Sequence, residues 1–159
     1  MIKYIRTTPP ARRVQQDYRT SYANRRWREQ SAAFLQQYPF CVWCLFSGKI
    51  NEGVSLHALA GQRNLIVDHI RPHRGNDQLF WDPDNWQTLC KRPCHDQVKQ
   101  NSERQGANWW ELLHGTAISS GAFEHVLQHR DWIPAGLATL VDAIAYVTSP
   151  SSLIHAAAQ

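Results

Sequence analysis

The sequence lacks any apolar run long enough to cross a membrane. Its first residues also lack the apolar segment and the small-residue cleavage site of an export signal. We therefore expect a cytoplasmic protein that makes no membrane contact. Charged residues are few, at 19%, beside 43% hydrophobic residues, and this balance excludes a disordered chain. The 159 residues suffice for one domain with its own core but not for two full-sized domains.

Cysteine is scarce, and its placement is informative. The four cysteines form two close pairs, Cys41-x2-Cys44 and Cys90-x3-Cys94, with none left over. In a reducing compartment such pairs bind metal more often than they form disulfides. Thiolates are soft ligands that suit Zn2+. We expect one structural zinc site, the alternative being four buried free thiols.

Positive charge is concentrated in one part of the chain. Residues 1–99 carry 15 Lys and Arg against 8 Asp and Glu, a balance of +7, whereas residues 100–159 carry 2 against 5, a balance of -3. A cationic surface concentrates polyanions, and nucleic acid is the commonest polyanion for a cytosolic protein. A basic face that is merely solvated is the alternative reading.

The order of elements follows from patterning. Residues 1–16 form a basic arm without an apolar period. Residues 17–37 predict an amphipathic helix, or two short ones, with a basic outer face, ended by Pro39. The Cys41–Cys44 pair lies in a short apolar knuckle that closes at Gly48, and a loop over about residues 50–64 follows.

The next segment predicts two strands and a helix. Residues 65–70 are β-branched and short, residues 85–90 can form the returning strand, and residues 94–100 can open a helix. Asp68 and His69 are therefore adjacent on the first strand. Since neighbouring strand residues point to opposite faces, a shared site there requires a bulge or a strong twist.

Residue types in this segment suit phosphodiester hydrolysis. A neutral imidazole can activate a water molecule. A hard cation held by one carboxylate and one imidazole can stabilise the phosphate charge and the departing oxygen. Asp68, His69 and His95 provide these groups.

The segment resembles the HNH endonuclease family, the ββα-metal fold, over about residues 17–100. The resemblance is carried by Asp-His on a strand, by Asn85 in Asp-Asn-x-Gln-x-Leu-Cys, and by Cys-His at the start of a helix. It implies that His69 is the general base and that Asp68 and His95 bind one divalent ion, Mg2+, Mn2+ or Ni2+. Asn85 would brace the loop between the strands and help to hold the base. The resemblance also makes Cys41, Cys44, Cys90 and Cys94 the zinc ligands.

One departure from the family pattern leaves two alternatives open. The second cysteine pair is C-x3-C where the family commonly has C-x2-C. Either the loop bulges at Pro93, which we expect, or His95 replaces Cys94 as a zinc ligand.

Phosphate contacts are plausible for His73 and for basic residues in or beside the motif. These are Arg71, Arg74, Lys91, Arg92 and Lys99.

Residues 105–159 predict helices without a recognisable family. They could pack on residues 17–104, contact another protein, or form a poorly ordered extension.

We thus predict an α+β fold with a ββα-metal core, a four-cysteine zinc site, a basic N-terminal helix and a C-terminal helical extension. The resemblance implies metal-dependent DNA cleavage that leaves 5'-phosphate and 3'-hydroxyl ends. The phrases Val-Asp-His-Ile-x-Pro-His-Arg-Gly and Leu-Phe-Trp-Asp are similar to small phage HNH proteins encoded near terminase genes, so terminase is an expected partner beside DNA. The alternatives are a non-catalytic, zinc-stabilised DNA-binding module and an interaction protein that works through residues 105–159.

Overall fold

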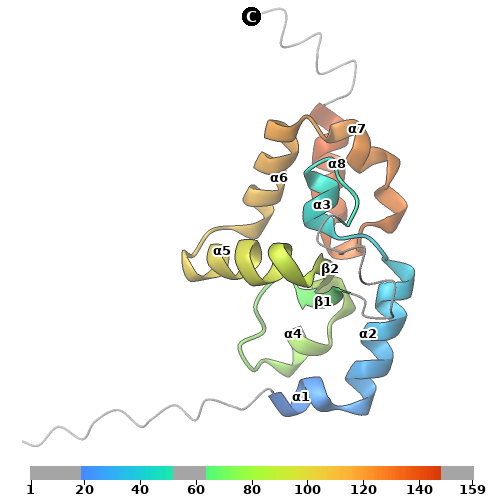
Figure 1. Cartoon of the computed structure of the whole chain (residues 1–159), viewed down its shortest axis with the longest axis vertical. Coiled ribbons are helices and arrows are strands. Elements are labelled where there is room, and N and C mark those ends of the chain that lie inside the picture. The colour runs from blue at the N-terminus through green and yellow to red at the C-terminus, as the bar shows by residue number, and fades with distance from the viewer. Residues whose placement is uncertain (1–18, 52–63, 148–159) are drawn as a thin grey trace, which may run out of the picture.

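A computed structural model describes residues 19–51 and 64–147. It contains a small antiparallel sheet surrounded by helices, and the two strands are followed directly by a helical segment (Figure 1). The predicted α+β class with a strand, strand, helix core is therefore confirmed. The basic arm predicted for residues 1–16 and most of the loop predicted for residues 50–64 lie outside the described residues.

The N-terminal part forms two helices, as one of the alternatives had it. Helix α1 (Arg19–Ala23) and helix α2 (Arg25–Gln37) meet at Asn24. The Asn24 side chain accepts a hydrogen bond from the backbone nitrogen of Arg26 at 2.8 Å, which caps the start of α2. Helix α2 ends at Gln37, with Tyr38 as its C-cap directly before Pro39, and buries Trp27 and Phe34 toward the sheet.

Helix α3 (Val42–Phe46) forms the knuckle that carries the first cysteine pair. Cys41 is its N-cap residue, and Gly48 follows it with a φ of 73°, in the left-handed region that favours glycine. The backbone nitrogens of Ser47 and Lys49 both donate to the carbonyl of Cys44, at 3.0 and 2.9 Å. This tight turn fixes the two cysteines on a short, buried element.

Strand β1 (Leu65–His69) pairs antiparallel with strand β2 (Trp86–Cys90). The register runs without interruption from Leu65 opposite Cys90 to His69 opposite Trp86. Of the bulge or strong twist that we expected at Asp68 and His69, the bulge is absent, because both residues take part in regular pairing. Their side chains therefore leave the strand on opposite faces.

Short helices connect and follow the strands. Helix α4 (Asp77–Trp81) and a 3-10 turn, η2 (Pro83–Asn85), lie between β1 and β2. After β2 the chain forms η3 (Lys91–Lys99), which continues into α5 (Gln100–Arg104). The extra residue of the C-x3-C pair is absorbed at Arg92, whose φ and ψ of -130° and 137° are not helical.

The C-terminal part is helical and packs on the knuckle. It comprises α6 (Trp109–Ser120), α7 (Phe123–Gln128), the turns η4 (Arg130–Trp132) and η5 (Ala135–Leu137), and α8 (Ala138–Val147). One hydrophobic core joins these helices to α3 and β2. Its fully buried members include Leu45, Leu89, Leu113, Leu137 and Ile144.

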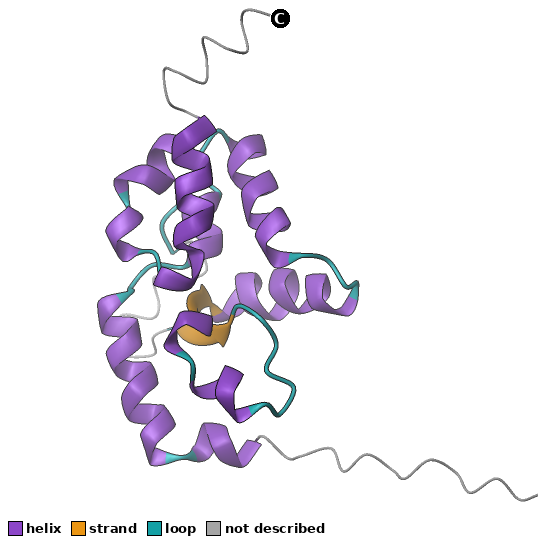
Figure 2. Cartoon of the chain, turned by 180° about the vertical axis from the view of Figure 1, so that it is seen from behind, coloured by secondary structure: helices purple, strands orange, loops and turns teal. Residues whose placement is uncertain are grey.

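A second, aromatic core lies on the other face of the sheet. It contains Trp27 and Phe34 from α2, Phe80 from α4 and Trp86 from β2. Figure 2, seen from behind, shows the strands between the two groups of helices. None of the helices in the described part of the chain has the length and apolar character that a bilayer crossing needs.

Candidate metal centres of the sheet and knuckle

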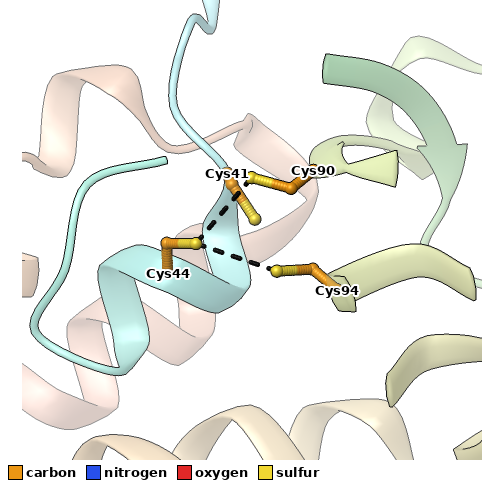
Figure 3. Close-up of side chains that lie close together, drawn as sticks. All are labelled: Cys41, Cys44, Cys90 and Cys94. Atoms are coloured by element: carbon orange, nitrogen blue, oxygen red, sulfur yellow. Dashed lines mark hydrogen bonds between the residues drawn. The ribbon is translucent and has the colours of Figure 1, made fainter. Parts of the chain in front are cut away.

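The four cysteine side chains converge on one point (Figure 3). The Cys44 Sγ lies 3.9 Å from the Cys90 Sγ and 3.7 Å from the Cys94 Sγ, and all four sulfurs lie within 4.8 Å of one another. A tetrahedral zinc with bonds of about 2.3 Å places its sulfurs about 3.8 Å apart. The cluster is therefore close enough to bind a zinc ion.

The burial and close packing of the four thiols suit a bound cation. All four cysteines are buried and free of disulfides. Hydrogen bonds from neighbouring thiols, together with burial, raise the pKa of Cys41 and of Cys94. Packed thiolates repel one another unless a cation neutralises them, so metal binding is what allows such a group to ionise.

The C-x3-C spacing does not draw His95 into the cysteine cluster. The sulfur of Cys94 completes the group, while the ring of His95 faces Asp68. Of the two alternatives, the structure has the irregular backbone before Cys94, with a cis peptide bond between Arg92 and Pro93. Cys94 and His95 thus serve different sites.

Asp68 and His95 form a second pair of candidate ligands. The Asp68 Oδ1 lies 3.6 Å from the His95 Nε2, and both residues line a cleft of about 620 Å3. Two atoms at this separation can bind one divalent ion with bonds of about 2.1 Å, so the pair fits such an ion. With Asp68 and His95 as the two ligands from the described residues, such an ion would keep positions for water and phosphate oxygens.

A hydrogen bond at Nδ1, the ring nitrogen that faces away from Asp68, fixes the orientation of His95. Its Nδ1 lies 2.7 Å from an Asp96 carboxylate oxygen, and this hydrogen bond lowers the pKa of Asp96. An ionised carboxylate only accepts, so Nδ1 donates to Asp96 and Nε2 is the ring nitrogen that faces Asp68. A carboxylate behind a metal-binding histidine is a common arrangement in metalloproteins.

Gln87 is a site residue that the sequence interpretation missed. It lies opposite Asp68 in the sheet and is fully buried. Its Nε2 donates to the Asp68 Oδ2 at 2.9 Å. Burial raises the pKa of Asp68, while Lys99, His95 and Gln87 act in the opposite direction. The signal in the sequence was a glutamine between the apolar residues Trp86 and Leu89 of a predicted strand.

His69 lies on the other face, 4% exposed, in an aromatic setting. Its ring stacks on Trp27 with centroids 5.6 Å apart and planes at 17°. Its Nε2 lies 3.1 Å from the carbonyl oxygen of Phe80, which can only accept, so Nε2 carries the proton and the neutral ring keeps a lone pair on Nδ1. Burial lowers the pKa of His69.

Asn85 ties the loop between the strands together. Its Oδ1 accepts from the Arg71 backbone nitrogen at 2.9 Å, and its Nδ2 donates to the carbonyls of Arg71 and Leu79, both at 3.0 Å. The side chain is 1% exposed. The bracing geometry is thus present, and the link from this geometry to catalysis stays a prediction.

The predicted phosphate contacts separate into two groups. Arg71 and Arg74 are exposed in the segment after β1, and their contact with DNA stays a prediction. His73 is half-buried, with its Nε2 3.0 Å from the Tyr22 hydroxyl. Burial and Asp68 raise the pKa of Tyr22 to about 12.

Lys99 requires a correction. The side chain is 1% exposed, its ammonium is paired with Glu103, and it lies 5.3 Å from the ring centroid of Trp109. An enclosed ammonium of this kind cannot serve as a surface contact to DNA, so the structure argues against that prediction. Its contribution is internal, as a positive charge near Asp68.

Comparison with known proteins bears on this region alone. The family model described as HNH endonuclease matches residues 41–101, a range that contains both candidate metal centres and His69. Searches of the curated proteins and of the solved structures return no match for the chain. A domain of this family supports a nuclease or DNA-interacting function. The chain therefore carries an HNH endonuclease domain over residues 41–101.

Proposed function

We propose that this protein is a metal-dependent endonuclease that hydrolyses DNA phosphodiester bonds. The observation that carries the proposal is the facing pair of Asp68 Oδ1 and His95 Nε2, 3.6 Å apart on the cleft. A zinc site alone would explain the cysteines, but it would not explain a histidine that a second carboxylate holds with its Nε2 toward Asp68. Binding of DNA alone needs no such pair.

The residues of the chain divide the chemistry between them. Asp68 and His95 would hold a divalent ion, which would supply charge stabilisation for the scissile phosphate and the departing oxygen. His69 accepts the proton of the attacking water on Nδ1, because Phe80 holds Nε2 in its protonated state. The lowered pKa of His69 keeps the imidazole neutral, which is the state that a base requires.

The buried position of His69 sets a condition on how substrate can reach it. Tyr22 and Trp27 contact its ring, and the same two residues line the cleft. His69 therefore lies one side chain behind the wall of the cleft, and substrate must displace that wall to meet the base. The burial of His69 is also the observation that favours the second candidate function, a non-catalytic, zinc-stabilised DNA-binding module.

A finer role is proposed on sequence resemblance alone. The phrases around Asp68 and Leu79 are similar to small phage HNH proteins encoded near terminase genes. We extend the proposal to phage DNA packaging or processing with a terminase, in the cytoplasm of a bacterial host.

The test is nicking of supercoiled plasmid by zinc-loaded protein in EDTA, Mg2+, Mn2+ or Ni2+. We expect cleavage with at least one of these ions and none in EDTA. His69→Ala should lower the nicking rate about 100-fold or more, as expected when a general base is lost. His114→Ala, at a half-buried histidine outside the site, is the matched control and should cut at the wild-type rate. If the wild type binds DNA but does not cut it with any ion, the binding module is the correct function.

A further inference from the structure

A buried chain of hydrogen bonds leads from Asp68 to a residue outside the matched domain. The Trp109 Nε1 donates to the Gln87 Oε1 at 2.9 Å, and the Gln87 Nε2 donates to the Asp68 Oδ2 at 2.9 Å. Gln87 is fully buried and Trp109 is 4% exposed. Trp109 is the first residue of α6, beyond the family match at residues 41–101.

The chemistry of the three groups fixes the direction of the chain. An indole nitrogen can only donate a hydrogen bond, so the carbonyl oxygen of the Gln87 amide must face Trp109. The amide nitrogen then has to face Asp68, where it engages Oδ2. As a result, Oδ1 is the oxygen that lies toward His95. The indole thus selects which carboxylate oxygen is presented to an ion.

Trp109 is itself held firmly. Its ring stacks on Trp43 of α3, with centroids 5.7 Å apart and planes at 25°. The ammonium of Lys99 lies over the ring at 5.3 Å, and Glu103 fixes that ammonium. The chain of hydrogen bonds therefore starts from an indole anchored to the cysteine knuckle and ends at the predicted ion ligand.

We propose that Trp109 is a positioning residue for the ion-binding carboxylate of Asp68 and that it acts through Gln87. This proposal rests on the proposed function in so far as Asp68 is an ion ligand. It makes α6 part of the machinery of the site, since the hydrogen-bond partners of metal ligands commonly change metal affinity when they are removed.

The test is Mn2+ binding to the zinc-loaded full-length chain without DNA, followed by the electron paramagnetic resonance of free Mn2+. Zinc stays on the thiolates, because these soft ligands prefer it to Mn2+. Trp109→Phe keeps an aromatic ring between Trp43 and Lys99 but removes the donor. We expect the Kd for Mn2+ to rise about three- to tenfold in this variant and about tenfold or more in Gln87→Leu.

A double variant separates positioning from a merely structural role. If the indole acts through Gln87, adding Trp109→Phe to Gln87→Leu should weaken binding no further, whereas independent effects would add. Trp110→Phe, at the neighbouring half-buried tryptophan of α6, should leave the Kd unchanged. Zinc content and the thermal midpoint of each variant show that it is folded at the temperature of the titration.

The outcomes separate this inference from the proposed function. Asp68→Asn should abolish Mn2+ binding. If it does, a higher Kd for Mn2+ in the Trp109→Phe variant supports the inference. Loss of binding in Asp68→Asn with an unchanged Kd in Trp109→Phe would overturn the inference and leave the nuclease proposal standing. An unchanged Kd for Mn2+ in the Asp68→Asn variant would contradict both the proposed ion site and the inference.

Discussion

Asn85 uses its entire side-chain amide on the backbone of one loop. Its oxygen accepts from the Arg71 nitrogen, and its nitrogen serves the carbonyls of Arg71 and Leu79. The loop runs from the end of β1 through α4, and α4 supplies the Phe80 carbonyl that holds His69. An asparagine suits this position because it both donates and accepts, which neither Asp nor Leu does.

Asn85→Ala leaves a buried N–H group and two carbonyls without their side-chain partner. We expect the free energy of unfolding to fall by about 2–4 kcal/mol. Urea denaturation followed by circular dichroism measures this loss. Asn101→Ala, at an exposed position whose side chain accepts from Arg104, is the control and should change stability by less than about 0.5 kcal/mol. Equal losses in the two variants would contradict the bracing role.

Residue type made part of the site predictable from the sequence. The cysteine cluster could be predicted because ligand chemistry depends on the kind of side chain, and for the same reason Asp68 and His95 stay predicted ligands. Gln87 and Trp109 could not, since their importance comes from a contact between residues 22 positions apart. Lys99 was misjudged for the same reason, because a lysine in a basic segment gives no sign that Glu103 and Trp109 enclose it.

At the scale of elements, the turn between β2 and the following helix separates two candidate metal centres. Cys90 ends the strand and Cys94 lies just beyond the irregular backbone at Arg92. This arrangement directs Cys94 to the other three cysteines and His95 to Asp68. One additional residue in the turn is thus compatible with both sites.

Substitutions of Cys94 and of His95 should affect zinc binding and Mn2+ binding separately. Cys94→Ala should lower the zinc content well below about one ion per chain and lower the thermal midpoint, because a tetrahedral site loses a ligand. His95→Ala should keep the zinc but lose Mn2+ binding. Zinc released into a colorimetric chelator, and Mn2+ titration, measure the two quantities. If His95→Ala instead lost the zinc, His95 would be a zinc ligand after all.

The strands show which part of a pattern can be trusted. Alternation correctly implied that Asp68 and His69 face opposite sides of the sheet. The expected bulge came from the assumption that the two side chains must meet in one site. In the structure each face has its own partners, with Gln87 beside Asp68 and Trp27 beside His69.

At the scale of the whole molecule, the C-terminal helices are part of the core that contains the cysteine cluster. Leu113 and Ala117 of α6 are buried together with Leu45, Phe46 and Leu89. Ser120 also donates to the carbonyl of Phe46 at 3.0 Å. A chain cut after Gln105 would expose this surface, so truncation tests stability before it tests function. Single substitutions on α6 are the better probe.

Leu113→Ala and Ile118→Ala form a matched pair on helix α6. Leu113 is fully buried, whereas Ile118 is 54% exposed. Leu113→Ala should lower the free energy of unfolding by about 2–5 kcal/mol, since it opens a cavity in the shared core, and Ile118→Ala should change it by less than about 0.5 kcal/mol. Because Leu113 and the cysteines share that core, zinc release and loss of near-ultraviolet circular dichroism should follow one transition in both variants. If zinc stayed bound after the C-terminal helices of Leu113→Ala had melted, the cysteine cluster and the C-terminal helices would unfold independently. Trp109 would then not be held rigidly enough to position Asp68.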